Sequence, residues 1–475
     1  MNGRPEALEV VHIARGARVR SAAVDVHRTR LRGVEFATPA LDVAELVWPR
    51  TVPPPALDVP LTEVIEFLVE TGSRLDLEKN EHLAAACANT ARINHLPRDV
   101  SERLYRGLGR FFQRELVEFE VEQSLGANVD GWSEIVRPTG SIMRVRPFPI
   151  RILHFLAGNA PGLAAVTLMR SCLSRGVHLL KLPSNDLFTA PAILLTMADI
   201  DPAHPLVRSH SAAYWRGGNE AVEREIFRTE LFDTVVAWGG ESAIRNVQAM
   251  TGPGLDLVAL NPKVSISLIG NEAFADDETL DAATRAAALD VGHQEACQNS
   301  RIQFVEGTAE EVGRYCQRLV ADLQAAASPD GGRPTPPEIL QTVAERVAAG
   351  EPVRTWGRPD GSGMVIRSAA PLPIYPIGRT VNVVPVRDLH EATRYVDTST
   401  QTVGVYPDTR RSAVRNAMCA SGAQRIVALG ASIGTEPPHG RPHDGFNVLH
   451  RMVRWVVEEE RPPSPALTGM NGSGG

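Results

Sequence analysis

Residues 151–184 carry the clearest architectural signal in the chain: RILHFLAGNAPGLAAVTLMRSCLSRGVHLLKLPS. The first apolar run, RILHFL, predicts a strand that ends in a glycine turn, AGNAPG. LAAVTLMRSCLSRG then predicts a helix that stops at Gly176, and VHLLKLPS predicts a short buried strand. A strand, a helix and a second strand in this order indicate a parallel strand pair joined by a crossover helix.

The same alternation continues toward the C-terminus. FDTVVAWGGESAIRNVQAM predicts a strand, a glycine turn and the start of a helix, and a second alternating unit begins near VSISLIGNEAF. The two units predict an α/β protein built on parallel, doubly wound sheets. Ligands bind such sheets at the carboxyl ends of the strands, so the turns that follow the strands are the candidate binding segments.

The chain length of 475 residues favours two domains. We expect a strand-rich N-terminal segment at 1–55, which ends at a Pro-rich break, and a first α/β domain at 56–260. A second α/β domain follows at 261–435. Residues 436–460 are expected to form a C-terminal helix that returns to the first domain, and the Pro/Gly/Ser-rich residues 461–475 are expected to form a disordered tail.

Composition excludes several classes of protein. The net charge of -7 gives no electrostatic basis for binding nucleic acid, and no apolar run is long enough to cross a bilayer. Five cysteines without CxxC spacing argue against a disulfide framework and against a zinc site, so no metal is expected. No secretory signal is visible, and a cytoplasmic location is expected.

One cysteine differs from the others in its context. Cys297 lies in a polar turn, GHQEACQNSRI, just before a predicted strand. A thiol flanked by backbone N–H groups can be a nucleophile, whereas the alternative is a structural cysteine at a helix end. His293, one helical turn earlier, either deprotonates the thiol or faces solvent. The other four cysteines lie in predicted helices or at a helix end and are assigned to packing: Cys87, Cys172, Cys316 and Cys419.

Two turns after strands carry further candidates. Asn159 in AGNAPG can direct its amide at a developing oxyanion, although Asn also forms turns without any function. Lys181 ends a strand and Ser184 follows it, which suits the ribose hydroxyls and 2′-phosphate of a dinucleotide. The alternative is a strand-end lysine that merely reaches solvent. Only three of the 49 basic residues are lysines, which favours a specific role for Lys181.

Two later motifs are weaker on their own. Gly239 and Gly240 in AWGGESAIRN can let a phosphate approach a helix N-terminus, or can form an ordinary strand-to-helix turn. His443 and Asp444 in PHDGFNVLHRMVRWV suggest acid–base chemistry. The preferred interpretation of this pair is a turn that caps the last helix.

The order of these motifs resembles the aldehyde dehydrogenase superfamily, and more closely its LuxC-like branch of acyl-CoA or acyl-protein thioester reductases. The likeness rests on AGNAPG, LLKLPSND, WGG, QEACQNSRI and the closing QRIVALG and PHDGFNVLHRMVRWV, and it runs from about residue 141 to residue 457. It implies an aldehyde dehydrogenase-like fold, with a Rossmann-type NADP-binding domain at 56–260 and a catalytic domain at 261–435.

The resemblance also implies roles for the candidate residues. In its position, Cys297 resembles the acyl-accepting nucleophile of the family. Asn159 and the backbone N–H of Cys297 resemble the oxyanion hole of the family. NADPH is the implied cofactor. Its implied contacts are Lys181, Ser184, Gly239 and Gly240.

Departures from the superfamily pattern favour reduction over hydrolysis. Hydrolytic members carry a water-activating Glu where this chain has Ala259 in VALNPKVS, while Lys263 falls on the lysine of that motif. The EIFGP segment is replaced by PLPIYPIG, which has no Glu. Without a base, water attacks an acyl-enzyme slowly.

The resulting expectation is an NADPH-dependent reductase that converts a long-chain acyl thioester into an aldehyde through acyl-Cys297. The donor is acyl-CoA, an acyl carrier protein or a partner acyl-protein synthetase, and the enzyme is expected to be a homo-oligomer. Two alternatives from other classes stay open: an acyltransferase that uses the acyl-enzyme without hydride, and a silent scaffold subunit. A third alternative, from within the same superfamily, is a reductase of acyl phosphates.

Overall fold

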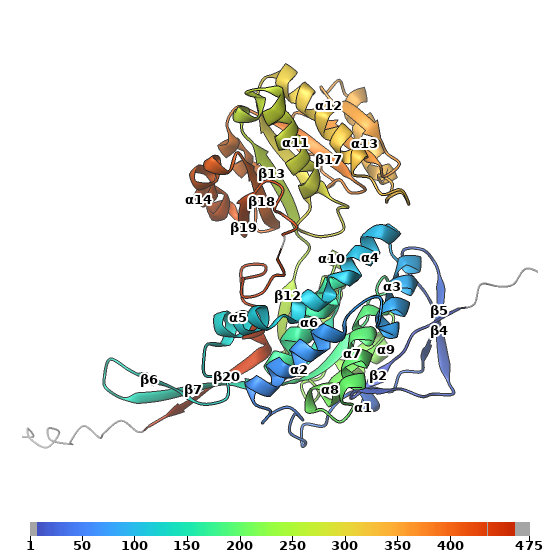
Figure 1. The fold of residues 1–475 in the computed structure, drawn as a ribbon, viewed down its shortest axis with the longest axis vertical. Coiled ribbons are helices and arrows are strands. Elements are labelled where there is room, and N and C mark those ends of the chain that lie inside the picture. Colours follow the sequence, from blue (N-terminus) through green and yellow to red (C-terminus); the bar gives the residue numbers. More distant parts are fainter. Residues whose placement is uncertain (1–6, 435, 461–475) are drawn as a thin grey trace, which may run out of the picture.

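The computed structural model describes residues 7–434 and 436–460, so the tail predicted at 461–475 lies outside the described residues. Two α/β domains lie one above the other, and a long three-stranded sheet projects from the lower one (Figure 1). Each domain is built on a seven-stranded sheet. The chain crosses from the first domain to the second after β12 and returns after β19, because the last strand pairs with the lower domain.

The first sheet has the order β12-β11-β8-β9-β10-β2-β3, and its first five members are parallel. Their bounds are β8 (Arg151–Phe155), β9 (Val177–Lys181), β10 (His210–Ala213), β11 (Thr234–Trp238) and β12 (Asp256–Leu260). β2 (Ile13–Ala14) pairs antiparallel with β10, and β3 (Ala17–Arg18) completes the edge. The strand order reverses between β8 and β11, which creates the crevice where ligands bind in doubly wound sheets. The predicted strand–helix–strand unit and the parallel sheet are confirmed.

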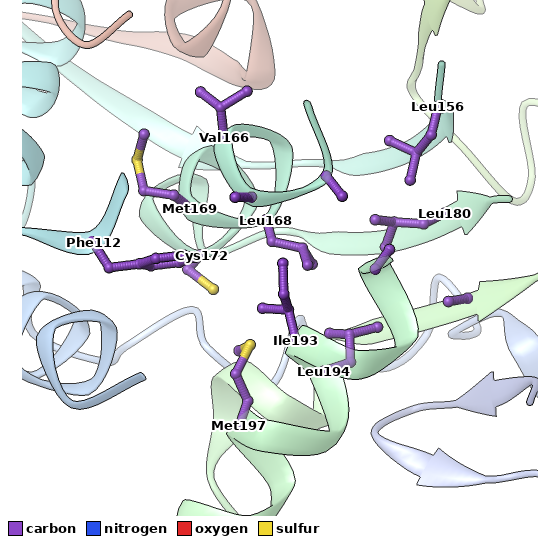
Figure 2. Close-up of a cluster of buried hydrophobic side chains, with 14 of the residues drawn as sticks. Phe112, Leu156, Val166, Leu168, Met169, Cys172, Leu180, Ile193, Leu194 and Met197 are labelled. Atoms are coloured by element: carbon purple, nitrogen blue, oxygen red, sulfur yellow. The ribbon is translucent and has the colours of Figure 1, made fainter. Parts of the chain in front are cut away.

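Apolar side chains pack on both faces of this sheet, which is why β8 is buried along its whole length. Figure 2 shows part of the larger core, where side chains from η1 (Leu108–Phe112), α6 (Gly162–Ser174) and α7 (Thr189–Ile200) meet. Cys172 lies among them, so its predicted packing role is confirmed. The other helices of the domain are α2 (Leu61–Arg74), α3 (Glu81–Ile93), α4 (Arg98–Arg106), α5 (Arg114–Leu125), α8 (Pro205–Arg208), α9 (Glu220–Ile226) and α10 (Glu241–Met250).

The end of α6 shows why a glycine follows it. The helix closes on Arg175, which adopts a left-handed conformation with φ of 56°, one residue before the predicted stop. A Cβ on Gly176 would overlap the carbonyl oxygen of Ile150. Gly176 is therefore required by the close approach of the backbone rather than by its own φ.

The second sheet has the order β15-β16-β17-β14-β13-β18-β19, parallel except for β15. Its strands are β13 (Val264–Ile269), β14 (Ser300–Glu306), β15 (Arg354–Arg358), β16 (Gly363–Arg367), β17 (Thr380–Val386), β18 (Thr400–Tyr406) and β19 (Arg425–Ala428). Its helices are α11 (Asp277–Val291), α12 (Ala309–Ala325), α13 (Pro337–Ala348) and α14 (Arg411–Ser421). Cys316 is buried in α12, as predicted, but Cys419 is exposed on α14, so its assignment to packing is wrong.

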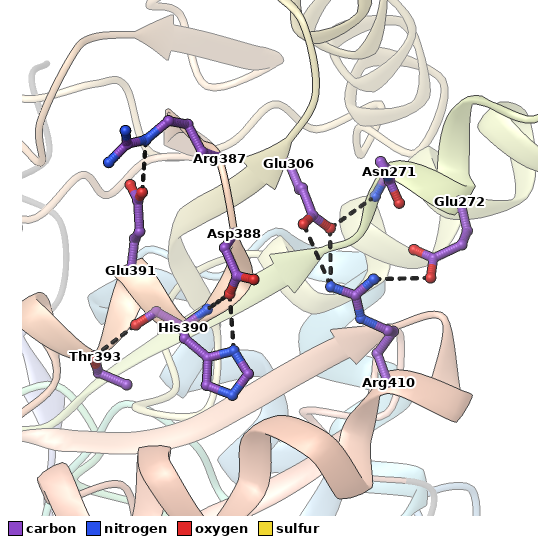
Figure 3. Close-up of polar contacts among 9 residues, drawn as sticks. All are labelled: Asn271, Glu272, Glu306, Arg387, Asp388, His390, Glu391, Thr393 and Arg410. Carbon is purple, nitrogen blue, oxygen red and sulfur yellow. Dashed lines mark hydrogen bonds and ion pairs between the residues drawn. The ribbon is translucent and has the colours of Figure 1, made fainter.

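Polar residues tie together the carboxyl ends of β13, β14 and β18. Arg410 binds Glu272 at 3.0 Å and Glu306 at 3.1 Å, and the backbone N–H of Asn271 donates to Glu306 (Figure 3). Cys297 precedes β14 and therefore lies at the opposite, amino end of the sheet. The cluster in Figure 3 joins strand ends of the second domain and is separate from the thiol.

The prediction of a C-terminal helix within 436–460 is wrong. A short 3-10 turn, η5 (Leu449–Met452), leads into a strand, β20 (Val453–Glu459). β20 pairs along its whole length with β7 (Ile142–Pro149), which also pairs with β6 (Ser133–Val136). The run VRWVV is β-branched and aromatic, and β7 supplies its backbone partners, so pairing across the chain overrides the helical interpretation.

The N-terminal segment is strand-rich, as predicted, with one exception. β1 (Leu8–Glu9), β4 (Val24–Arg28) and β5 (Glu35–Pro39) form a small sheet. The helix α1 (Val43–Leu46) follows β5 within the segment predicted to be strand-rich, and the Asp42 carboxylate caps its N-terminus. Cys87 is buried in α3, as predicted. No helix within the described residues is both long and apolar enough to span a membrane.

Candidate active site

Cys297 occupies a loop between α11 and β14, at the amino end of the second sheet. We call residues 292–300 the thiol loop. Ser265 at the start of β13 donates to the carbonyl oxygen of Cys297 at 2.8 Å and accepts from the backbone N–H of Thr402 at 3.1 Å. The predicted polar turn is therefore present, and it is tied to two neighbouring strands.

The polar side chains around the thiol hold the loop in shape. Gln294 has a left-handed backbone with φ of 57°, and its buried amide donates to the carbonyl of Thr380 at 2.7 Å and accepts from the Thr380 N–H at 3.0 Å. Asn299 accepts from the N–H of Ala296 at 2.9 Å. These bonds explain much of the polar composition of the turn, and they preorganise the backbone N–H groups that flank the thiol.

Asn159 reaches this loop from the first domain. It follows β8, and its Nδ2 donates to the carbonyl oxygen of Glu295 at 2.7 Å, two residues before Cys297. A Cβ on Gly158 would overlap the side chain of Asn185, so the turn must pass close to the segment after β9. The structure thus brings the two predicted members of the oxyanion hole to one place, and one N–H of the Asn159 amide remains for another acceptor.

The environment of Cys297 favours the neutral thiol. Burial raises the pKa of Cys297 most, and the nearby Asp444 carboxylate raises it further. A hydrogen bond from Gln401, the loop's own backbone N–H and the charge of Arg301 act in the opposite direction without cancelling the rise. The thiol therefore needs a proton acceptor in order to act as a nucleophile at neutral pH.

Two residues of this site, Gln401 and Trp238, escaped sequence reasoning. Gln401 at the start of β18 donates from Nε2 to Asp444 Oδ1 at 3.1 Å and lies 3.3 Å from His443 Nε2. Its Oε1 is buried and has no partner among the described residues. The ring of Trp238, at the end of β11, lies 5.0 Å from that of His443.

The preferred interpretation of His443 and Asp444 as a cap for the last helix is wrong. A tight turn, in which His443 and Phe446 exchange two backbone hydrogen bonds, brings both side chains to the Gln401 amide, and Asp444 acts on the pKa of Cys297. The His-Asp pair in PHDG was a signal for this site, whereas nothing in the sequence indicated Gln401, whose position depends on sheet pairing.

His293 lies beside charged residues of the first domain. Burial and then the charges of Arg379 and Arg103 lower its pKa to about 4, and Asp99 acts against this. These partners place the imidazole against α4 of the first domain, and His293 is absent from the main groups that shift the pKa of Cys297. The side chain is partly buried, so the solvent-facing interpretation is wrong, and a role as base stays a prediction.

The cofactor candidates share one edge of the first sheet. β8, β9 and β11 are adjacent and parallel, so Asn159, Lys181 and the glycines after β11 lie at neighbouring carboxyl ends. Gly240 is the N-cap of α10, and no atom would lie within 4 Å of a Cβ added there. The helix N-terminus is therefore open to an approaching phosphate.

The surroundings of the Lys181 side chain suit a ligand that carries several hydroxyl groups. Its Nζ lies 5.6 Å from the ring of Tyr214 and 5.9 Å from that of Phe155, and it donates no hydrogen bond to the residues the structure describes. Burial lowers the pKa of Lys181 to about 8, against the charge of Glu223. Ser184 lies in the turn after β9 with a short, uncharged side chain. These residues fit the ribose and phosphates of a dinucleotide.

Comparison with known proteins agrees with this arrangement. A family model described as acyl-CoA reductase (LuxC) matches residues 56–455. The long-chain acyl-protein thioester reductase of Vibrio harveyi is 27% identical over 321 residues, which are 67% of this chain and 66% of that protein. The protein of the same name from Photorhabdus luminescens is 30% identical over 324 residues, 67% of this chain and 65% of that protein. The matched part of the chain spans just under two thirds of the length of these relatives.

Solved structures show the same fold. Aldehyde dehydrogenase 21 from Physcomitrella patens, in complex with the product succinate, has a TM-score of 0.71 at 12% identity and covers 97% of this chain and 100% of its own. NADP-dependent glyceraldehyde-3-phosphate dehydrogenase from Bacillus halodurans, complexed with NADP, has a TM-score of 0.69 at 12% identity. The match covers 95% of this chain and 99% of that protein. The predicted aldehyde dehydrogenase fold is confirmed, and the family match over most of the chain shows that this protein belongs to the acyl-CoA reductase (LuxC) family.

Proposed function

We propose that this protein reduces a long-chain acyl thioester to the aldehyde with NADPH, through an acyl group carried on Cys297. The observation that carries the proposal is the hydrogen bond from Asn159 to the thiol loop. It joins the nucleophile to the edge of the first sheet where Lys181 and Gly240 lie. The curated relatives are named long-chain acyl-protein thioester reductases, which supports the choice of substrate class.

Acylation is carried by the residues of the thiol loop. The sulfur of Cys297 attacks the thioester carbonyl, and the free N–H of Asn159 and the backbone N–H of Cys297 hold the oxyanion. Collapse releases the carrier thiol and leaves the acyl group on Cys297. The buried bonds of Gln294 and Asn299 keep the loop in place, so the donors require little reorganisation.

Lys181 and Ser184 would hold the ribose and 2′-phosphate of NADPH, and Gly239 and Gly240 would leave room for its phosphates. When bound there, NADPH supplies a hydride to the acyl carbon. Ser184 favours the phosphorylated cofactor because a carboxylate in its place would repel the 2′-phosphate.

Hydride transfer, rather than hydrolysis, is the outcome that the chain's own residues favour. Ala259 on β12 stands where hydrolytic members of the superfamily carry a water-activating Glu, and it has no group that could take a proton. Lys263, the lysine of that motif, donates to the carbonyl of Thr398 at 2.6 Å. A long-lived acyl-enzyme is the expected consequence.

The proposal also covers the acyl donor, the assembly of subunits and the cellular compartment. The acyl group arrives as acyl-CoA, on a carrier protein or from a partner acyl-protein synthetase. Assembly into a homo-oligomer is supported by the projecting sheet, where Val136, Trp455 and Val457 are exposed. All five cysteines are free, which suits a reducing cytoplasm.

The test is intact-protein mass spectrometry after incubation with a long-chain acyl-CoA, with and without NADPH. The expected result is an acyl adduct on Cys297 that persists alone and is discharged to aldehyde when NADPH is added. Cys297→Ala is expected to abolish both the adduct and the aldehyde. An adduct that NADPH leaves intact would support the acyltransferase instead. No adduct from acyl-CoA, a carrier-protein thioester or a partner-loaded donor would support a silent subunit.

A further inference from the structure

The N-terminal segment carries a concentration of positive charge that the proposed function does not use. Residues 17–34, here called the basic arm, hold five arginines and one aspartate, whereas the whole chain has a net charge of -7. All five arginines are exposed: Arg18, Arg20, Arg28, Arg30 and Arg32. The arm precedes residues 56–455, so its charge lies outside the part of the chain that the family model matches.

Four of the five arginines have no counter-charge within the part of the chain that the structure describes. Arg28 pairs with Glu35 at 2.9 Å, but the other four form neither an ion pair nor a hydrogen bond with the described residues. Arg15, just before the arm, shows the contrast, because it donates to the carbonyl oxygen of Ala44 at 3.0 Å. The unpaired guanidinium groups of the arm keep their attraction for an anionic partner.

β4 presents apolar side chains to solvent between these charges. His27 fixes the face of β4 that packs on the domain, because its ring lies 4.9 Å from that of Tyr214 and 5.2 Å from that of Phe36. Side chains alternate along a strand, so Val24 and Val26 point to the opposite side. They are 61% and 67% exposed. Neighbouring valines that are exposed to this extent among charged residues indicate a surface that a partner covers.

Charged and apolar side chains follow one another along the arm. Arg18 and Arg20 precede β4, whereas Arg30 and Arg32 lie in the turn after it, on either side of Leu31, which is 38% exposed. β4 pairs only with β5, so one edge of the strand is free. Figure 1 shows β4 and β5 on the side of the first domain away from the projecting sheet of β6, β7 and β20. The arm is therefore separate from the surface assigned to assembly.

We propose that the basic arm binds the surface of an anionic lipid bilayer and holds the protein there without spanning the membrane. The arginines attract the charged head groups, while Val24, Val26 and Leu31 enter the boundary between head groups and acyl chains. A nucleic acid would attract the arginines but leave the valines in water, whereas a bilayer suits both kinds of side chain.

The long acyl chains of the proposed reaction favour a bilayer over an acidic protein as the partner, because such chains partition into lipid. This preference rests on the proposed function, but the binding itself does not. Vesicle binding is measured without any acyl substrate, so it can fail while Cys297 still forms its adduct, and the reverse can also occur.

The test is cosedimentation of the full chain with two kinds of vesicle, one of phosphatidylcholine alone and one of equal parts phosphatidylcholine and phosphatidylglycerol. We expect binding to the mixed vesicles only, and weaker binding as salt rises. Arg30→Gln with Arg32→Gln should weaken binding about tenfold or more. Arg285→Gln with Arg415→Gln removes the same charge from exposed positions on α11 and α14 that form no ion pair with the described residues, and it should bind as the wild type does.

The apolar contribution is tested by Val24→Thr with Val26→Thr, which keeps the branched shape that suits a strand. This variant should bind the mixed vesicles severalfold more weakly, with the same dependence on salt. Equal binding of both vesicle types, no binding to either, or wild-type binding by the Arg30→Gln, Arg32→Gln variant would overturn the proposal. Capture of an acidic acyl carrier protein by the arm, without vesicle binding, would overturn it in favour of a protein partner.

Discussion

Asn159 and Glu295 join the two domains through one hydrogen bond, from the Asn159 amide to the Glu295 carbonyl oxygen at 2.7 Å. Asn159 lies in the turn after β8 of the first sheet, and Glu295 lies two residues before Cys297. Any shift of one domain against the other therefore changes the position of the Asn159 amide relative to Cys297. The bond couples the fit of the two domains to the surroundings of the thiol.

Replacement of Asn159 by Ala should remove an oxyanion donor and loosen the thiol loop together. We expect acylation of Cys297 to slow by about 100- to 1,000-fold, measured by quenched mass spectrometry with acyl-CoA. Asn219→Ala makes the same change at an exposed position whose side chain caps no helix, and it should acylate at the wild-type rate. An Asn159→Ala protein that acylates normally would exclude Asn159 from the oxyanion hole.

Removal of the Asp444 charge should lower the pKa of Cys297. The carboxylate favours the neutral thiol, so Asp444→Asn favours the thiolate, while burial, Gln401 and Arg301 continue to act. The charged group facing Asp444 itself is Lys263. The midpoint of iodoacetamide labelling of Cys297 against pH should move to lower pH, with Cys297→Ala as the blank. A midpoint that stays in place or rises would contradict the assigned electrostatics.

A negative charge at Ser184 should discriminate between the two nicotinamide cofactors. Ser184→Asp should weaken NADPH binding by about tenfold or more through repulsion of the 2′-phosphate, while NADH binding changes little. Ser184→Ala is the matched control and should bind NADPH nearly as the wild type does. Both affinities can be measured from nucleotide fluorescence without any acyl substrate. Equal losses for NADPH and NADH would show that Ser184 lies away from the 2′ position.

Three adjacent buried histidines should make the first domain sensitive to acid. Their rings lie side by side on β8, β9 and β10, with His154 hydrogen-bonded to His178 at 3.0 Å and the rings of His178 and His210 5.0 Å apart. Burial lowers the pKa of His154 to about 3 and that of His210 to about 4, and holds that of His178 well below its usual range.

The folded state therefore binds these protons more weakly than the unfolded chain, so stability is present above the unfolded pKa and falls as pH drops below about 6.5. Each histidine adds up to about 1.4 kcal/mol of lost stability per pH unit. Urea unfolding at several pH values should show this slope, and His210→Asn should reduce it. An unchanged slope in the variant would contradict the prediction.

Local sequence was sufficient for the alternation of strands and helices in the two α/β domains and for the positions of the candidate cofactor turns. The βα units at AGNAPG, LLKLPS and AWGGES follow from apolar runs and glycine turns that act over a few residues. Cys297 also stood out locally, because a cysteine in a polar turn departs from the packing context of Cys172 and Cys316. The same reasoning assigned Cys419 to packing, but the side chain is exposed on its helix.

Long-range pairing decided the rest, since neither hydrogen-bonding partners across the chain nor the sheet register appear in local patterns. β20 is a strand because β7 supplies its partners more than 300 residues away in sequence. Gln401 and Asp444 meet Cys297 because β13, β14 and β18 are neighbours and because Glu120 and Arg170 of the first domain anchor the returning chain. Cys297 could therefore be recognised as a candidate from the residues around it, whereas the neighbours that shift its pKa come together only where three distant segments meet.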